Sequence, residues 1–304
     1  MTAIGVPEVP TAAPAPAPVV TEQRASASFW HAAWYRFRRN KLAMVSAAVV
    51  IIILLTGALA PWVAPYSETH VDLLHTLAGI SWHHLLGTDQ LGRDTLTRVI
   101  WGARTSMTVA IGATLIGAVI GIPVGVLAGW YGGGFDWVSL RLFELFTMVP
   151  TILAALLFVT IFGVNIWKLT LFIGITSWVG FGRLMRAQFL ALRDREFVQA
   201  ARAAGVPQHR IVIVHILPNA VGPMLVFFVQ QIPSVIFVAA GFSFLGLGIQ
   251  DPTADWGKMI NDSVSYLPID PLLVLVPILC IGIGCLAFCF VGDGLRDALD
   301  PTSK

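Results

Sequence analysis

Long apolar runs, separated by shorter polar segments, dominate the pattern along this chain of 304 residues. A helix rises about 1.5 Å per residue, so about 20 apolar residues cross the ~30 Å hydrocarbon layer of a membrane. The pattern predicts six transmembrane helices, at about residues 42–64, 106–130, 140–163, 167–182, 220–243 and 271–292. We therefore expect an all-α membrane protein.

The two ends of the chain differ from these runs. Residues 1–27 are rich in Pro and Ala without an apolar period, so we expect a disordered cytoplasmic tail. Residues 28–41 set aromatic side chains beside a basic cluster, which favours an interfacial amphipathic helix. A solvated basic flank is the alternative. The rest of the chain divides into three parts. Residues 42–104 form the first span and an extracytoplasmic loop, and residues 105–293 form a helical core that contains a long polar segment at 183–219. Residues 294–304 form a cytoplasmic C-terminus.

Composition and charge support a membrane location and set the orientation. Hydrophobic residues make up 56% of the chain and charged residues only 12%, which excludes an ordinary soluble domain of this length. The net charge of +2 does not suggest nucleic acid as a partner. Most of the 19 Lys and Arg residues fall on one side if the six spans alternate. The positive-inside rule therefore places both termini and the segment at 183–219 in the cytoplasm.

Small residues recur inside the predicted spans. Gly117, Gly121 and Gly125 are spaced by four, so they lie on one face of a helix. Such a ridge lets the backbone of a second helix come close. The spacing indicates a tightly packed helical bundle, without indicating which helices meet.

The long polar segment contains an Ala-rich stretch at residues 196–219. Helical spacing predicts a face of small side chains in its first half, made by Phe197, Ala200, Ala201 and Ala204. Gly205 suits a helix C-cap, Pro207 suits the first turn of a second helix, and Pro218 marks a new helix start. Small side chains let the surface of another protein approach closely. We therefore predict a docking segment rather than a catalytic loop.

This stretch resembles the EAA loop of ABC-importer permeases, in which Glu-Ala-Ala, a Gly and an Ile-x-Leu-Pro ending stand at fixed spacing. Gln199 replaces the Glu and His215 replaces the first Ile, while the spacing is kept. The resemblance implies that the loop docks into a cleft on a cytoplasmic ATPase and transmits its closure. The coupling residues that it implies are Glu196, Gln199, Ala200, Ala201, Gly205, His215, Leu217 and Pro218. An ordinary amphipathic loop between spans is the alternative.

Two more stretches are similar to the same family. Residues 84–94 and 102–104 resemble the Leu-Gly-Thr-Asp-x-Leu-Gly-Arg-Asp … Gly-Ala-Arg signature of the C-type permease of peptide importers. Residues 244–259 resemble its Phe-Leu-Gly-Leu-Gly … Trp-Gly-x-Met stretch, for which an interfacial helix anchored by Trp256 is the simplest role. The resemblance covers roughly residues 30–300. It implies the type I ABC importer (MetI-like) permease fold, with both stretches on the outer side.

The sequence carries no catalytic signature. It lacks Gly-x4-Gly-Lys-Ser/Thr, His-Glu-x-x-His and Gly-x-Ser-x-Gly, so we expect no catalysis by this chain alone and no bound cofactor. In the family, ATP and Mg are bound by partner ATPases. His70, His75, His83 and His84 lie in the first outer loop but match no firm metal-ligand spacing, so scattered surface histidines are favoured over a nickel or zinc site.

Polar side chains inside the predicted spans are the remaining candidates, because such groups usually face protein or water rather than lipid. Arg141 and Glu144 stand three residues apart, and we expect a structural ion pair; a substrate contact is the alternative. Gln230, Gln231 and Ser234 lie in the fifth predicted span. We predict that these three face a translocation pathway; hydrogen bonds between helices are the alternative.

The resemblance also implies a function and a set of partners. The chain would form half of a translocation pathway in the bacterial plasma (inner) membrane, surrounded by lipid and paired with a homologous B-type permease. Two P-loop ATPases and an extracytoplasmic substrate-binding protein would complete the importer, and alternating access would move the peptide substrate. Nickel and peptide-like compounds such as glutathione are alternative cargos. A secondary transporter without ATPases predicts internal repeats, which we do not find, and a membrane scaffold gives the docking loop no purpose.

Overall fold

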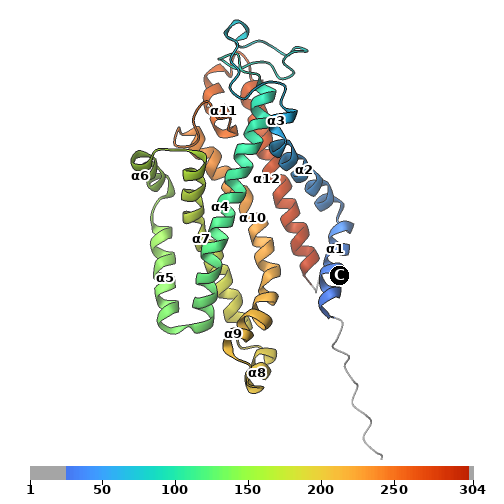
Figure 1. Cartoon of the computed structure of the whole chain (residues 1–304), viewed down its shortest axis with the longest axis vertical. Helices are drawn as coiled ribbons and strands as arrows, with labels where there is room; N and C mark the ends of the chain where they lie inside the picture. The colour runs from blue at the N-terminus through green and yellow to red at the C-terminus, as the bar shows by residue number, and fades with distance from the viewer. Residues whose placement is uncertain (1–24, 301–304) are drawn as a thin grey trace, which may run out of the picture.

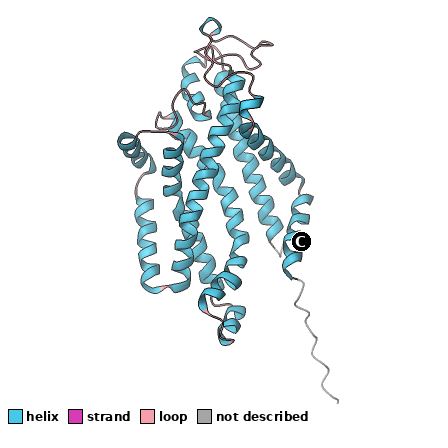
Figure 2. Cartoon of the chain, in the orientation of Figure 1, coloured by secondary structure: helices cyan, strands magenta, loops and turns pink. Residues whose placement is uncertain are grey.

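The computed structural model describes residues 25–300, which form an elongated bundle of helices (Figure 1). The tail predicted at residues 1–27 lies almost entirely outside the described residues. The described part contains no β-strand, in agreement with the all-α prediction (Figure 2). Its elements are α1 Ala25–Arg39, α2 Lys41–Ala58, α3 Ala60–Val63, η1 Leu73–His75, α4 Thr95–Tyr131, α5 Gly133–Met148, α6 Thr151–Phe162, α7 Ile166–Leu192, α8 Glu196–Ala203, α9 Gln208–Arg210, η2 Ile211–Ile216, α10 Leu217–Phe244, α11 Trp256–Ser263, η3 Val264–Tyr266 and α12 Leu272–Leu299.

Four helices in the described part are long and apolar enough to cross a membrane: α2, α4, the run Gln208–Phe244 that contains α10, and α12. The bent pair of α5 and α6 adds a fifth if it is one span. α7 has 27 residues and is long enough to cross a membrane, but its polar residues lower its mean hydropathy below that of these four helices. The number of six spans predicted from the apolar runs is therefore not confirmed, although the multi-pass helical architecture is.

The apolar run at residues 140–163 does not form one continuous helix. α5 ends at Met148, α6 begins at Thr151, and the two are bent by 81°. Pro150 has no backbone N–H and disfavours the helical conformation of the residue before it. Val149 is accordingly extended, with φ −80° and ψ 120°. The expectation of an unbroken span was wrong here.

α4 and α7 pack against each other through the predicted glycine ridge. A Cβ atom on Gly121 would lie 2.3 Å from the carbonyl oxygen of Trp178, and one on Gly125 would lie 2.4 Å from that of Gly182. At Gly117 the nearest atom is the hydroxyl oxygen of a serine on α7, at 2.6 Å. The ridge therefore works as predicted, and its partner is α7.

Two apolar clusters hold the bundle together. The larger joins buried side chains of α2, α4, α7, α10 and α12, among them Val50, Val109, Phe172, Ile236 and Phe288. The second lies where the bundle meets α8 and α9, and contains Phe181, Phe189, Ile211 and Ile216. The long loop after α3 and the short helix α11 lie at the opposite end of the molecule (Figure 1).

α1 is helical over most of the stretch predicted to be an interfacial helix. Phe37 is buried against Ala43 and Ala298, and Arg36 donates a hydrogen bond to the carbonyl oxygen of Asp300 at 2.7 Å. Asn40 then caps α2 by accepting a hydrogen bond from the Ala43 N–H at 3.1 Å. α1 is thus tied to the C-terminal end of α12, while its place at a membrane interface stays a prediction.

Candidate functional site

The segment predicted to dock an ATPase stands at one end of the molecule, beyond the bundle (Figure 1). Its helices α8 and α9 are joined by a turn in which Gly205 has φ +75°, a left-handed conformation that favours glycine. The Val206 N–H donates to the Ala201 carbonyl and the Gly205 N–H to the Arg202 carbonyl, both at 3.0 Å. These two bonds form a Schellman cap. Two short helices with a glycine turn were predicted, and both are present.

The side chains of α8 divide into two faces. Val198 is fully buried and Ala201 is 8% exposed, and both pack with Ile211 against the bundle. The exposed side chains include Phe197, Ala200 and, at the C-cap, Ala204. Ala201 stands three residues after Val198 and therefore shares its buried stripe. The small-residue face expected from spacing is thus narrower than predicted, because Ala201 points into the protein.

The segment continues without a break into the bundle. Residues Gln208–Phe244 form one helical run, with a π-helical stretch at Ile211–Ile216. Pro218, expected to mark a new helix start, lies in the first turn of α10, although no break separates α10 from the residues before it. Ile213 and Val214 in the π-helical stretch are 59% and 56% exposed. The sequence analysis placed both residues inside the docking segment but did not single them out as exposed apolar side chains.

Some polar side chains of the segment have partners within the described part of the chain. Gln199 donates from its amide to the Asp194 carbonyl at 3.1 Å, and the Arg202 guanidinium lies over the Trp130 ring at 4.9 Å. The His215 carbonyl accepts a hydrogen bond from Asn219, while the Nδ1 atom of His215 is buried without a hydrogen-bond partner in the described part of the chain. Of the remaining predicted coupling residues, Leu217 is half-buried, whereas Glu196 and Pro218 are exposed.

The three predicted pathway residues lie within about one turn of α10. Gln230 donates from Nε2 to Asp293 Oδ1 at 3.1 Å and packs on Gly292, where a Cβ atom would lie 2.6 Å from the Gln230 Cγ. Gln231 is partly buried and Ser234 is exposed. Gln230 therefore makes the contact between helices that we kept as the alternative, while Ser234 faces away from the chain's own bundle.

A groove of about 450 Å³ opens beside Gln230, between α10 and α12. Phe227 supplies an apolar wall, and Arg296 and Asp300 bring charges of both signs to its lining. The groove can therefore accommodate both apolar and charged groups. A role of Gln230, Gln231 and Ser234 in transport stays a prediction.

Two ion pairs lie along α5. Arg141 Nη1 is 2.6 Å from Glu144 Oε2, and both side chains are more than half exposed. Arg186 of α7 donates two hydrogen bonds to the Asp136 carboxylate, from Nε to Oδ1 and from Nη2 to Oδ2, the second at 2.7 Å. The sequence pointed to the first pair through its spacing. It gave no signal for the second, whose partners are 50 positions apart.

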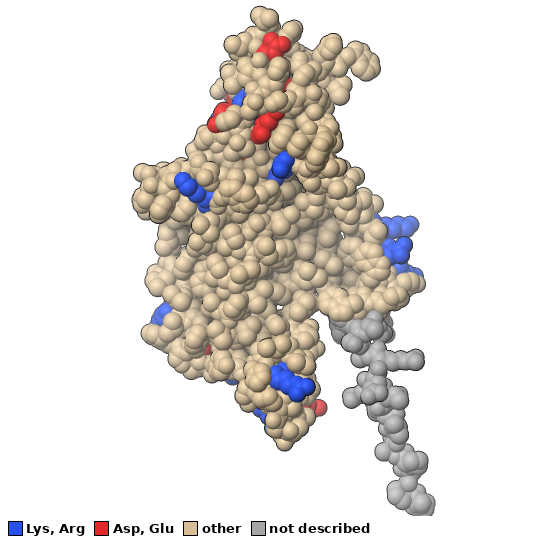
Figure 3. Space-filling model, viewed as in Figure 1, with Lys and Arg blue, Asp and Glu red and all other residues tan. Residues whose placement is uncertain are grey.

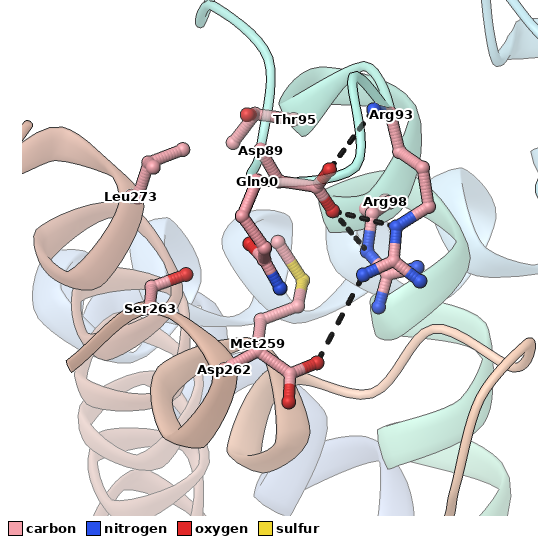
Figure 4. A pocket seen from close by; sticks show the side chains of 9 residues that line it. All are labelled: Asp89, Gln90, Arg93, Thr95, Arg98, Met259, Asp262, Ser263 and Leu273. Carbon is pink, nitrogen blue, oxygen red and sulfur yellow. Dashed lines mark hydrogen bonds and ion pairs between the residues drawn. The ribbon is translucent and has the colours of Figure 1, made fainter. Parts of the chain in front are cut away.

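A buried cluster of charges joins the two outer signature stretches at the end opposite α8 (Figure 4). Asp89 accepts from Arg93 Nε at 2.6 Å, and Arg93 also donates to Asp251 at 2.5 Å. The Arg98 side chain is 2% exposed and lies 3.6 Å from Asp251, and Asp262 lies 3.9 Å from Arg93. Burial alone would raise the pKa of Asp251, but the hydrogen bond and charge of Arg93 outweigh it and lower that pKa.

Asp255 and Trp256 complete this outer packing. Asp255 caps α11 and accepts a hydrogen bond from the Ser106 hydroxyl of α4 at 3.3 Å, and its complete burial raises its pKa. Trp256 donates from its indole to the Val99 carbonyl at 3.1 Å, and a Cβ atom on Gly102 would lie 2.6 Å from its ring. Trp256 is therefore a packing residue inside the protein, and the expectation of an exposed interfacial anchor was wrong.

Two of the four histidines in the predicted outer loop lie beside carboxylates, and a third, His70, stacks on the ring of Tyr66. His75 Nδ1 is 2.8 Å from Asp72, and His84 Nδ1 is 3.0 Å from Asp94. Among residues 25–300, no three His, Cys, Asp or Glu side chains are placed to hold a metal ion.

Comparison with known proteins assigns this geometry to a family. Residues 121–304 match the family model of the binding-protein-dependent transport system inner membrane component, and residues 28–79 match the N-terminal TM domain of oligopeptide transport permease C. The oligopeptide transport system permease protein OppC of Haemophilus influenzae is 37% identical over 281 residues, which cover 91% of this chain and 90% of that protein.

Further similarities extend over the same region. The glutathione transport system permease protein GsiD of Escherichia coli is 41% identical over 276 residues, covering 90% of this chain and 91% of that protein. In fold, the chain is similar to a chain of the MetNI methionine ABC transporter in an inward-facing conformation, with a TM-score of 0.56, 17% identity, and coverage of 67% of this chain and 96% of that one. The chain therefore belongs to the family of inner-membrane permease components of binding-protein-dependent transport systems, and it has the permease fold of ABC importers.

Proposed function

We propose that this chain forms half of the translocation pathway of an ATP-driven importer for di- or oligopeptides or for peptide-like compounds such as glutathione. The oligopeptide and glutathione permeases that it resembles along nine-tenths of their lengths support this class of cargo. Nickel is the alternative cargo. The pairing of His75 and His84 with aspartates does not favour a metal site on the outer loop.

The segment α8–α9 couples this pathway to cytoplasmic ATPases. The observation that carries the proposal is the division of α8 into an exposed face of Ala200 and Ala204 and an anchoring face that contains Ala201. Small exposed side chains let an ATPase approach closely, and the anchor makes the segment move with the bundle. Because Gln208–Phe244 is one helical run, a displacement of the segment passes directly into α10, which carries Gln230.

The other parts of the importer are separate chains. Two P-loop ATPases bind ATP and Mg, an extracytoplasmic binding protein delivers the cargo, and a homologous B-type permease supplies the other half of the pathway. On α10, Ser234, Phe237 and Val238 form an exposed face that the second permease can cover. The N- and C-termini lie in the cytoplasm of a bacterial inner membrane, and hydrolysis by the partner chains shifts the bundle between inward- and outward-open states.

The test is recovery of the ATPases with the tagged chain from membranes. Ala200→Glu places a long charged side chain on the proposed docking face without altering the Schellman cap. Ala191→Glu makes the same change at an exposed position of α7 near the same end of the molecule. We expect the wild-type chain and Ala191→Glu to recover P-loop ATPases and ATP hydrolysis, and Ala200→Glu to lose most of both.

Two outcomes would contradict the proposal. Equal recovery of ATPases with Ala200→Glu and Ala191→Glu would show that this face is not the docking surface. A wild-type chain that purifies without any ATPase would favour a secondary transporter instead.

A further inference from the structure

A groove between α2 and α4 has no role in the transport scheme above. Its volume is about 370 Å³, and Leu54 of α2 and Met107 and Ile111 of α4 give it apolar walls. Arg104 and Thr108 are the polar side chains that line it. Arg104 ends the Gly-Ala-Arg stretch of the outer signature, in which Gly102 packs under Trp256 and Ala103 is buried. Packing thus accounts for Gly102 and Ala103, but it does not account for the positive charge of Arg104.

The groove forms where the backbones of α2 and α4 touch. A Cβ atom on Gly57 would lie 2.8 Å from the backbone nitrogen of Arg104, so the two helices meet at this point. Leu54 and Ala58, which flank Gly57 on α2, line the groove. The crossing therefore places the Arg104 side chain at an apolar groove with an opening to the outside of the bundle.

Arg104 has no acidic partner in residues 25–300. Its side chain is exposed, and its guanidinium lies 5.5 Å from the centre of the Trp101 ring. Arg93, just before the same helix, and Arg98, in its first turn, are both paired with the buried Asp89. An unpaired cation beside apolar walls is unfavourable in a membrane unless it reaches the headgroups or meets an anion.

The position of Arg104 along the membrane normal fits the headgroup region. α2 begins at Lys41 and reaches Gly57 after about 24 Å of helix, close to the thickness of a ~30 Å hydrocarbon layer. Neighbouring side chains of α2, including Ile52 and Leu55, are apolar and more than half exposed, as on a helix that faces lipid. Arg104 therefore lies near the edge of the leaflet opposite the α8–α9 end.

We propose that this groove binds one anionic phospholipid, with its phosphate on Arg104 and an acyl chain along Leu54, Met107 and Ile111. Charge complementarity selects this occupant. A guanidinium without a carboxylate partner attracts a lipid of net negative charge, whereas the ammonium of a zwitterionic lipid offsets part of that attraction. The Trp101 ring covers one side of the guanidinium and leaves its N–H edges for phosphate oxygens.

The first test uses the wild-type importer, purified with its partner chains and stripped of lipid. Dioleoylphosphatidylglycerol and dioleoylphosphatidylethanolamine are titrated separately, and bound lipid is counted by native mass spectrometry. We expect one phosphatidylglycerol per chain to bind about fivefold more tightly than phosphatidylethanolamine, because the attraction between one cation and a lipid of net negative charge is of that size. Equal affinity of the two lipids would overturn the proposal.

Variants then locate the lipid. Arg104→Gln should abolish the preference for phosphatidylglycerol, and Ala58→Phe should remove the bound lipid by filling the groove while leaving the charge in place. Lys168→Gln is the matched control, because Lys168 is exposed at the same end, at the start of α7, and bonds only the Phe162 carbonyl. A preference retained in Arg104→Gln, or lost equally in Lys168→Gln, would overturn the assignment. So would cross-linking of Arg104→Cys to the second permease in native membranes, since a protein would then cover the groove.

Discussion

Arg93 and Arg98 carry their charges almost out of reach of solvent. A buried guanidinium is tolerated only where carboxylates compensate for its lost hydration. Asp89 does this for both arginines, since its Oδ2 atom lies 2.6 Å from Arg93 and 3.7 Å from Arg98. Asp251 adds a second contact from a segment far along the chain. These few side chains join the first outer loop to the stretch before α11.

Asp89→Asn should destabilise the outer end of the protein. The substitution leaves two buried arginines with too little negative charge, which costs about 3 kcal/mol for a buried pair that loses one partner. We expect the thermal unfolding midpoint of the purified protein to fall by about 5 °C or more, measured by tryptophan fluorescence. His75→Gln removes an exposed side-chain contact with Asp72 in the same loop and should leave the midpoint within about 1 °C. Equal small shifts in both variants would show that the charge cluster is not stabilising.

Contacts between residues that are close in the sequence were predictable from the sequence. The glycine cap at Gly205 and the pair of Arg141 and Glu144 follow from spacing alone. The inward orientation of Ala201 was not predictable, because it depends on which stripe of α8 meets Ile211. The charge cluster was not predictable either, since Arg93 and Asp251 are 158 positions apart and no periodicity relates them.

At the level of helices, α4 and α7 make one of the close contacts that small residues create in the bundle. The carbonyl oxygens of Trp178 and Gly182 fill the space that side chains on Gly121 and Gly125 would need. The sequence supplied the ridge, because a four-residue spacing is local. It could not supply the partner, because the spacing of glycines on one helix does not indicate which of the other predicted spans packs against it.

Gly121→Leu should therefore disrupt the α4–α7 pair. Even the first added carbon meets a backbone atom that has no rotamer with which to move away, and overpacking of this kind costs about 1–3 kcal/mol. We expect a loss of folded, monodisperse protein in size-exclusion chromatography. Gly282→Ala on α12 is the control, since nothing lies within 4 Å of its added carbon. Normal yield of Gly121→Leu would show that the helices pack less closely than described.

In the whole molecule, α10 joins the proposed coupling segment at one end to the packing around α11 at the other. The first residues of α10 continue from that segment, and near its last turn the Ala240 carbonyl lies 2.3 Å from where a Cβ atom on Gly257 of α11 would be. A shift of the coupling segment along this helix therefore meets the outer packing around Asp255 and Trp256. This arrangement suits alternating access, because one continuous helical run reaches from the proposed ATPase face to the opposite end of the molecule.

The orientation of this arrangement in the membrane is open to a direct prediction. Lys and Arg gather around α1 and at the end that carries α8 (Figure 3), which the positive-inside rule assigns to the cytoplasm. In a background with Cys280, Cys285 and Cys289 replaced by Ser, Leu74→Cys, at a position that is 91% exposed, should react with a membrane-impermeant maleimide in intact cells. Ala204→Cys should react only after the cells are permeabilised, and the cysteine-free chain should not react at all. The opposite pattern would place α8 outside the cell, where no ATP-driven partner could reach it, and coupling through this segment would then be excluded.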